Sequence, residues 1–333
     1  MSEQPLIRSA RFRSEREADW SRLENLVSQA EKRGASSLSL DEAQELAGLY
    51  RKAATGLSVA RDISMDRSLL VYLESLVSRA FLTVYAPQEN LTGVVARFFA
   101  ESAPRAVRAS AGAIGLATLA MVLGFFIAWA LFAADPAWFY TFVPAELAGE
   151  RGPGASTEML RSVLFDQEAE LAGQLGVFAA MLFSHNTRVA LFAFALGVFA
   201  CVPSFLLTVY NGLVLGAFAG LYANRDLGYE LFGWLSIHGV TELSAIIIAA
   251  AGGFRLGLAV LFPGQMTRKD ALRAVSRDAA KLAVVSGIML LAAGLLEGFA
   301  RQLVQDTEVR LLVGWSIGAA WLSWFLLAGR GRT

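Results

Sequence analysis

The sequence predicts an all-α protein, in which a polytopic membrane bundle of about six transmembrane helices follows an N-terminal cytoplasmic helical domain. The 333-residue chain is 55% hydrophobic and 17% charged, which is less charge than a soluble protein of this length usually carries. The charge is also segregated, because residues 1–108 hold 15 of the 29 basic and 14 of the 29 acidic residues. Several later runs without charge reach the roughly 20 apolar residues that a transmembrane helix needs.

Residues 1–90 form the predicted cytoplasmic domain, which we interpret as three amphipathic helices. Apolar side chains recur there at three- and four-residue spacing, and Ser39 or Asp41 can cap a helix over residues 40–62. The domain has no glycine-rich phosphate loop and no nucleophile motif, so its predicted role is docking, either onto envelope or cytoplasmic protein partners or onto its own membrane domain. Residues 91–108 mix Val, Phe and Arg, which predicts a linker helix at the cytoplasmic membrane interface.

The transmembrane domain is predicted over residues 109–333. Its clearest span lies between Arg108 and Asp135, which enclose 26 uncharged residues. Three later apolar runs are also long enough to cross a bilayer or nearly so. They cover residues 231–254, 282–300 and 311–329.

The segment between Glu170 and Arg225 has two interpretations. Its 54 residues contain one charge and suffice for two spans that turn near Pro203. Residues 171–187 could instead form a half-helix or a re-entrant segment, and the sequence leaves these alternatives open.

Lysine and arginine in the short loops predict the orientation of the chain. Residues 135–170 contain two basic residues and seven acidic ones, whereas the loop over residues 263–281 contains five basic residues. If there are six spans, that basic loop lies on the same side as both termini. We therefore expect a multi-pass protein of the bacterial inner (cytoplasmic) membrane with both termini in the cytoplasm.

Composition and motifs argue against several functions. Equal numbers of basic and acidic residues argue against a nucleic-acid binder, and the single Cys201 excludes a disulfide framework. Two histidines and one cysteine are too few for a catalytic zinc site. Ser236 and Ser244 flank His238, but no Gly-x-Ser-x-Gly turn accompanies them. The sequence therefore predicts no enzyme activity, no catalytic residue, no cofactor and no metal; the lipid bilayer is the predicted partner.

Glycines recur at four-residue spacing in three of the apolar segments. This spacing lets a neighbouring backbone approach closely, and van der Waals contact drives helix association in lipid. We interpret the glycines as helix-packing positions inside the bundle; the alternative is a face that forms a homo-oligomer. The positions are Gly212, Gly216, Gly220, Gly253, Gly257, Gly294 and Gly298.

Polar side chains inside the apolar segments predict an intramembrane polar site. His238 and Glu242 are four residues apart on one helical face, and Glu297 interrupts a later span. A charge inside a bilayer is costly, so such residues face protein or a water-filled cavity. Asn186, Arg188 and Asn211 are further candidates for this region.

Two hypotheses follow from these residues. In the first, the protein is a non-enzymatic scaffold or recruitment factor, and the polar residues clamp its helices together. In the second, it is a channel or transporter, and the same residues line a permeation or proton site. A hydrated cavity at Glu242 favours transport, whereas a dry packed contact favours the scaffold.

Ordered motifs across the membrane domain resemble the stage II sporulation protein M family. The segments SHNTRVALFAFALGVFACVPSFLLTVYNGLVLGAFAG, HGVTELSAIIIAAAGGFRLG and LLEGFA follow the family's order over roughly residues 90–304. Thr187 stands where the family has a second Asn, and Ser236-Ile237 stands where a Pro often precedes the His. The matching positions are Asn186, Gly197, Pro203, Asn211, Gly212, His238, Gly239, Glu242, Leu243, Ala245 and Glu297.

The resemblance implies a multi-pass membrane protein without catalytic activity of its own. The resemblance implies a role like that of the family's namesake in spore formers, a membrane anchor that recruits peptidoglycan-degrading partners during engulfment. The charged N-terminal domain departs from the namesake and resembles the broader branch found outside spore formers. This departure favours envelope-linked assembly or transport over a role in sporulation.

Overall fold

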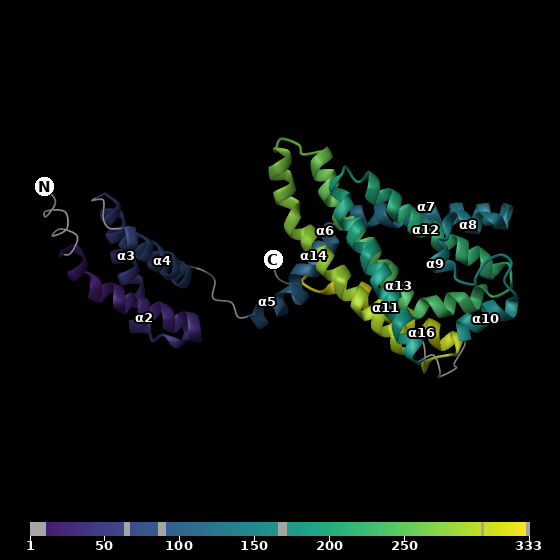
Figure 1. Ribbon diagram of the computed structural model, residues 1–333, viewed down its shortest axis with the longest axis horizontal. Coiled ribbons are helices and arrows are strands. Elements are labelled where there is room, and N and C mark those ends of the chain that lie inside the picture. Colours follow the sequence, from purple (N-terminus) through teal and green to yellow (C-terminus); the bar gives the residue numbers. More distant parts are fainter. Residues whose placement is uncertain (1–10, 63–66, 86–90, 166–171, 301–302, 331–333) are drawn as a thin grey trace. The chain divides into compact units, whose positions relative to one another are not determined.

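The computed structural model describes residues 11–62, 67–85, 91–165, 172–300 and 303–330. Every regular element in these ranges is helical, which confirms the predicted all-α class (Figure 1). The chain forms two compact units, Met1–Val94 and Val95–Thr333.

The N-terminal unit is built from amphipathic helices whose apolar faces share one core. Leu23, Leu26, Leu73 and Leu76 lie in this core and are at most 1% exposed. Their spacing of three residues places each pair on one face of its helix, as the sequence pattern predicts. The helices are α2 (Glu17–Arg33), α3 (Leu40–Asp62) and α4 (Arg67–Tyr85).

The start of α3 is fixed by a capping box. Ser39 Oγ accepts a hydrogen bond from the Glu42 amide (3.2 Å), and the Glu42 carboxylate accepts one from the Ser39 amide (2.9 Å). Two backbone N–H groups that a helix start leaves without partners are thereby satisfied. Of the two predicted caps, Ser39 is the one that the structure uses.

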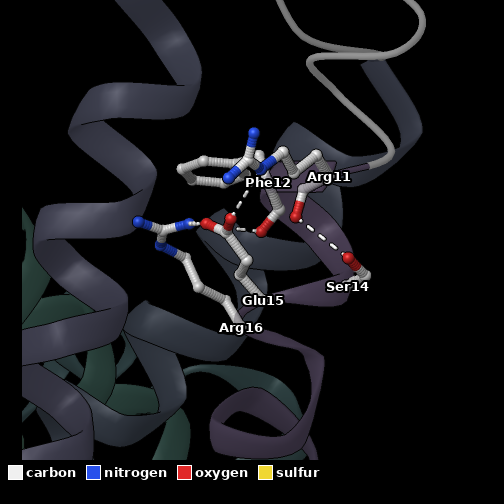
Figure 2. A network of polar contacts seen from close by, with 5 residues as sticks. All are labelled: Arg11, Phe12, Ser14, Glu15 and Arg16. Carbon is white, nitrogen blue, oxygen red and sulfur yellow. Dashed lines mark hydrogen bonds and ion pairs between the residues drawn. The ribbon is translucent and has the colours of Figure 1, made fainter.

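A compact polar network precedes α2 (Figure 2). The Glu15 carboxylate accepts hydrogen bonds from Arg11 Nε (3.0 Å) and Arg16 Nη1 (3.2 Å), and Ser14 Oγ donates to the Arg11 carbonyl (3.1 Å). The Arg16 guanidinium lies 4.2 Å from the centre of the Phe12 ring. These contacts order the chain as it enters the three-helix core.

Ion pairs between helices cover the surface of the N-terminal unit. Arg22 donates two hydrogen bonds to Glu45 Oε2 and Oε1, at 2.7 Å and 3.1 Å, and Arg79 pairs with Glu31 at 2.7 Å. The hydrogen bonds from Arg22 hold the pKa of the Glu45 carboxyl below its ordinary value. Because the partners are largely exposed, these pairs add little stability individually and mainly define a charged, soluble surface.

The segment after residue 90 joins the membrane domain through its second half. It comprises α5 (Leu91–Arg97), a π-helical turn η2 (Phe98–Ser102) and α6 (Ala103–Ala109). Ala103, Ala106 and Val107 are buried against the membrane helices, so α6 is packed along one whole face. Arg108 anchors this end by donating to the backbone carbonyls of Phe325 (2.6 Å) and Ala328 (2.8 Å).

Long apolar helices make up the membrane domain. Five of them are long and apolar enough to cross a bilayer, and α11 runs without interruption over a similar length. For the segment that begins at residue 171, the sequence left a full span, a half-helix or a re-entrant segment open, and the continuous α11 is the full-length alternative. Pro203, near the predicted turn, lies in the first turn of α12. The helices are α7 (Ala111–Ala134), α11 (Ala172–Ala195), α12 (Val202–Ala223), α13 (Gly228–Leu261), α14 (Arg268–Leu295) and α16 (Thr307–Leu327).

Helix α4 is the sixth helix that could span a membrane by length and composition, among the residues that the structure describes. The sequence prediction did not include it among the spans. Its apolar side chains Leu73 and Leu76 lie in the core of the N-terminal unit, and its Glu74 and Arg79 pair with neighbouring helices. These contacts match a helix of a soluble bundle, because a spanning helix rarely carries two charges on its surface.

Helix α13 lies at the centre of the membrane domain and packs against α7, α11, α12, α14 and α16 (Figure 1). Many core-facing positions of its second half are small, and Ala245, Ala249, Ala250 and Ala251 are at most 2% exposed. Small side chains let several helices approach one central helix at once. The position of α13 explains why its polar residues meet side chains from other helices.

Short helices and arginine anchors cover one end of the bundle. The covering elements are η3 (Pro136–Trp138), α8 (Phe139–Phe142), α9 (Ala145–Ala148) and α10 (Thr157–Phe165). Arg310, which is 1% exposed, donates to the carbonyls of Val304 (2.7 Å) and Leu164 (3.0 Å). Arg225 donates to the Pro153 carbonyl (2.7 Å). The backbone of this region is therefore held by the guanidinium groups of Arg310, in α16, and Arg225, just after α12.

Candidate functional site

Two polar side chains of α13 turn into the membrane domain together. His238 and Glu242 are one helical turn apart, so they share a face. His238 is 4% exposed, and Glu242 is partly buried. The sequence predicted this pairing, and the structure directs both side chains toward the same neighbours.

Glu297 reaches the same point from the end of α14. It lies in a π-helical turn, η6 (Leu296–Ala300), and is 2% exposed. Its Oε1 atom is 4.0 Å from His238 Nε2. One nitrogen or oxygen atom from each of His238, Glu242 and Glu297 lies within 4.8 Å of the other two. We call these three residues the His-Glu-Glu triad.

Further side chains orient the triad. Asn186 of α11 donates through Nδ2 to Glu242 Oε1 at 2.6 Å, which restricts rotation of that carboxylate. The Trp234 ring lies edge-on to the His238 imidazole, with 5.3 Å between ring centres and 87° between planes. Two helices, α11 and α13, and the π-helical turn therefore hold the site, so its geometry depends on the packed bundle.

A cavity of about 170 Å³ lies beside the triad. It extends between the triad and the covering elements at one end of the bundle, where Leu147, Arg151 and Leu164 line it. Burial lowers the pKa of Arg151, whose guanidinium donates to the carbonyls of Leu147 and Ala148. The volume suffices for several water molecules, and polar side chains such as Asn186 and Asn211 stand among the mostly apolar lining residues.

The arrangement has definite chemical abilities. Two carboxylates this close inside a membrane repel each other unless they share a proton or a cation. An imidazole and carboxylate oxygens are also ligands for divalent metal ions. The site can therefore take up protons or a cation, but neither its geometry nor the other described residues show a nucleophile with an activating base.

The other predicted polar residues are placed differently. Asn211 lines the cavity, but its Nδ2 donates to the Leu207 carbonyl in its own helix (2.8 Å). Arg188 is exposed and is not among the residues that line the cavity, so its part in the polar site stays a prediction. Its position two residues after Asn186 turns it to another face of α11, because successive helical residues differ by about 100°.

The predicted glycines meet other helices of the same chain. A Cβ on Gly212 or Gly216 would overlap the α7 backbone, at the carbonyls of Met121 and Phe125 respectively. Gly220 faces the Phe132 ring, which a Cβ would approach to 2.8 Å. This stripe is covered by α7 within one chain, so it does not supply the alternative homo-oligomer face.

The remaining predicted glycines also lie within the membrane domain. A Cβ on Gly253 would meet the backbone of α11, and one on Gly257 would overlap the Gly197 carbonyl. Gly294 faces the Phe183 ring, and Gly298 lies in the π-helical turn beside Glu297. Gly253 and Gly257 therefore allow α13 to contact the backbone of α11 and of the turn that follows it.

Sequence reasoning missed several contacts that position these elements. Gly124 of α7 and Gly314 of α16 each lie against the backbone of a neighbouring helix. Ser204 donates to the Ala193 carbonyl across the turn between α11 and α12. The buried Arg310 carried a readable signal, since an arginine at the edge of an apolar run must find polar partners.

An apolar groove of about 750 Å³ lies between α14 and α16. Ala292, Leu295, Ile317 and Trp321 are among its lining residues. It offers no titratable group, so the chemistry of the membrane domain is concentrated at the triad.

The fold and the site define a multi-pass helical membrane protein with a polar site between its helices. The chain belongs to the Stage II sporulation protein M family, which matches residues 113–300, more than half of its length. Residues 10–86 match a domain of unknown function, DUF8413. No curated protein and no solved structure matches the sequence. The family resemblance predicted from the sequence is confirmed, and the matched segment contains the triad and Asn186.

Proposed function

We propose that this protein is a non-enzymatic scaffold of the bacterial inner membrane that recruits partners for envelope-associated assembly. The observation that carries the proposal is the backbone contact between α7 and α12 along the glycine stripe. Those helices form the most extensive helix pair of the membrane domain. A helix pair in backbone contact loses many van der Waals contacts if it separates, so the bundle is suited to a fixed platform.

The charged N-terminal unit supports the same proposal. Its surface carries both signs of charge, and α2, α3 and α4 are joined by ion pairs. Such a surface suits reversible contact with another protein, where complementary charge selects the partner. We place this unit and both termini in the cytoplasm, because lysine and arginine are concentrated in the corresponding loops.

Transport is the second candidate function, and the cavity beside Glu242 favours it. A transporter must expose its polar site to each side of the membrane in turn, whereas a scaffold holds one arrangement. The two functions therefore differ in whether the helices around α13 move. Both α7 and α16 pack against α13, so the distance between those two helices reports on such movement.

The test uses two spin labels on the full chain, at Leu119→Cys in α7 and Leu312→Cys in α16, with Cys201→Ser. Both leucines are exposed on the bundle surface, so the labels need not disturb the core. We expect one distance distribution between pH 5.5 and 8 and no ion flux in proteoliposomes. Two distributions that interchange with pH, together with flux abolished by Glu242→Gln, would replace the scaffold with a transporter.

Partner recruitment is tested in intact cells with a photocrosslinking amino acid. At the exposed Arg51 of α3 we expect discrete adducts with one protein species. At Leu119, on the surface of the membrane helices, we expect no such adduct. Equal labelling at both positions would contradict recruitment through the N-terminal unit.

A further inference from the structure

We infer that the His-Glu-Glu triad is a binding site for a single divalent transition-metal ion, with Zn²⁺ as the best fit. Histidine and carboxylate side chains from two separate segments converge here, His238 and Glu242 from α13 and Glu297 from the turn after α14. A bound ion joins these two segments inside the membrane domain. The inference does not depend on the scaffold proposal, because binding is measured without any partner.

The distances suit a metal ion after small adjustments of side chains. Zinc binds imidazole nitrogen and carboxylate oxygen at about 2.0–2.2 Å, so ligand atoms around it lie roughly 3–3.5 Å apart. The triad atoms lie within 4.8 Å of each other, and His238 Nε2 lies 4.0 Å from Glu297 Oε1. Rotation of a carboxylate closes such a gap without movement of the backbone.

Charge balance favours a divalent ion over an empty site. Two ionised carboxylates and a neutral imidazole carry a charge of −2, which a divalent cation cancels. A neutral assembly avoids the large cost of separate charges in a low-dielectric interior. Arg151, the cation that lines the far end of the cavity, is held by backbone carbonyls of its own segment.

The surroundings resemble the outer shell of a metal site. Asn186 holds one oxygen of Glu242 at 2.6 Å, and Trp234 packs edge-on against the ring of His238. Outer contacts of this kind fix ligand orientation and raise affinity. The adjacent cavity of about 170 Å³ leaves room for a water molecule as the fourth ligand.

The ligand set also selects among metals. One nitrogen and two oxygen ligands suit Zn²⁺ or Mn²⁺, whereas Ca²⁺ and Mg²⁺ prefer oxygen ligands alone. Copper(I) prefers sulfur, and Cys201 lies outside the cavity. The sequence argument against zinc counted histidines and cysteines, and it could not show that Glu297, which is distant in the sequence, joins His238 and Glu242.

The test begins with the full-length protein in detergent, freed of its affinity tag and treated with a chelator that is then removed. Calorimetric titration with ZnCl₂ should give one ion per chain, and MgCl₂ at the same concentration should give none. X-ray absorption of the zinc-loaded protein should show nitrogen and oxygen neighbours with one imidazole and no sulfur. Sulfur neighbours, or only water ligands, would overturn the assignment using the parent protein alone.

Matched variants then locate the ion. Glu242→Gln and Glu297→Gln should each weaken zinc binding at least about tenfold. Loss of an outer contact alone typically weakens metal affinity by that factor, and loss of a ligand should weaken it more. Glu230→Gln, on the same helix, and His185→Gln, in the cavity lining, should bind zinc like the parent. If the control variants lose zinc, or the glutamine variants keep it, the triad is not the site.

A conservative variant separates binding from folding. Glu297→Asp keeps a carboxylate and should retain measurable zinc binding, even where Glu297→Gln impairs folding. Zinc should raise the melting temperature of the parent and of Glu297→Asp, because a ligand that binds only the folded state stabilises it. No shift in either protein would contradict the inference.

Discussion

Gly216→Ala tests the close contact between α7 and α12 with the smallest change available. A Cβ at this position would overlap the carbonyl and Cα of Phe125, both of which are backbone atoms that cannot rotate away. The two helices must then separate locally by about 1 Å, which forfeits roughly a quarter to a half of each affected dispersion contact. The perturbation acts at the most extensive helix pair of the membrane domain.

The magnitude follows from two opposing effects. Overpacking of a close-packed contact costs about 1–3 kcal/mol, whereas replacing Gly by Ala within a helix gains up to about 1 kcal/mol. Gly115→Ala is the matched control, because it lies in α7 and a Cβ there meets nothing within 4 Å. The control receives the helix gain alone. Because both variants receive that gain, it cancels, and we expect Gly216→Ala to be less stable than Gly115→Ala by about 1–3 kcal/mol, the cost of overpacking.

Thermal unfolding in detergent measures this difference through the fluorescence of the seven tryptophans. For a domain of this size, 1 kcal/mol corresponds to about 2–4 °C in melting temperature. Gly216→Ala should melt below the parent and well below Gly115→Ala. If the two alanine variants melt together, the stripe does not form the contact and the packing argument fails.

Three further predictions concern other parts of the chain. Arg310→Lys removes the guanidinium that donates to two backbone carbonyls, so the free energy of unfolding should fall by about 1–3 kcal/mol. Thermal unfolding measures this loss, and an unchanged melting temperature would show that the Arg310 hydrogen bonds are dispensable. Ser39→Ala removes the α3 cap and should cost about 1 kcal/mol, seen as faster hydrogen exchange in the first turn of α3, whereas Ser39→Thr should exchange like the parent. In a protein with Cys201→Ser, the single substitution Glu158→Cys should react with membrane-impermeant thiol reagents in whole cells, whereas Met266→Cys should not. The reverse labelling pattern would refute the proposed orientation.

Much of the candidate site could be predicted from the sequence because its first two members are neighbours on one helix. His238 and Glu242 are four residues apart, and helical geometry alone places them on a shared face. Glu297 could be selected as unusual, since a carboxylate in an apolar span demands a partner. Its distance from His238 could not be predicted, because that depends on the π-helical turn that sets the direction of its side chain.

The helical class, the division into a charged and an apolar part, and the glycine stripe of α12 follow from the sequence, which also narrows the cap of α3 to Ser39 or Asp41. These features are local, since periodicity, capping and hydropathy act within a few residues along the chain. The tertiary structure alone decided that α7 covers the stripe and that Arg310 reaches Leu164. Each of these depends on how one helix is rotated about its axis and where it crosses another, and a rotation of about 100° per residue lets neighbouring positions face entirely different surroundings.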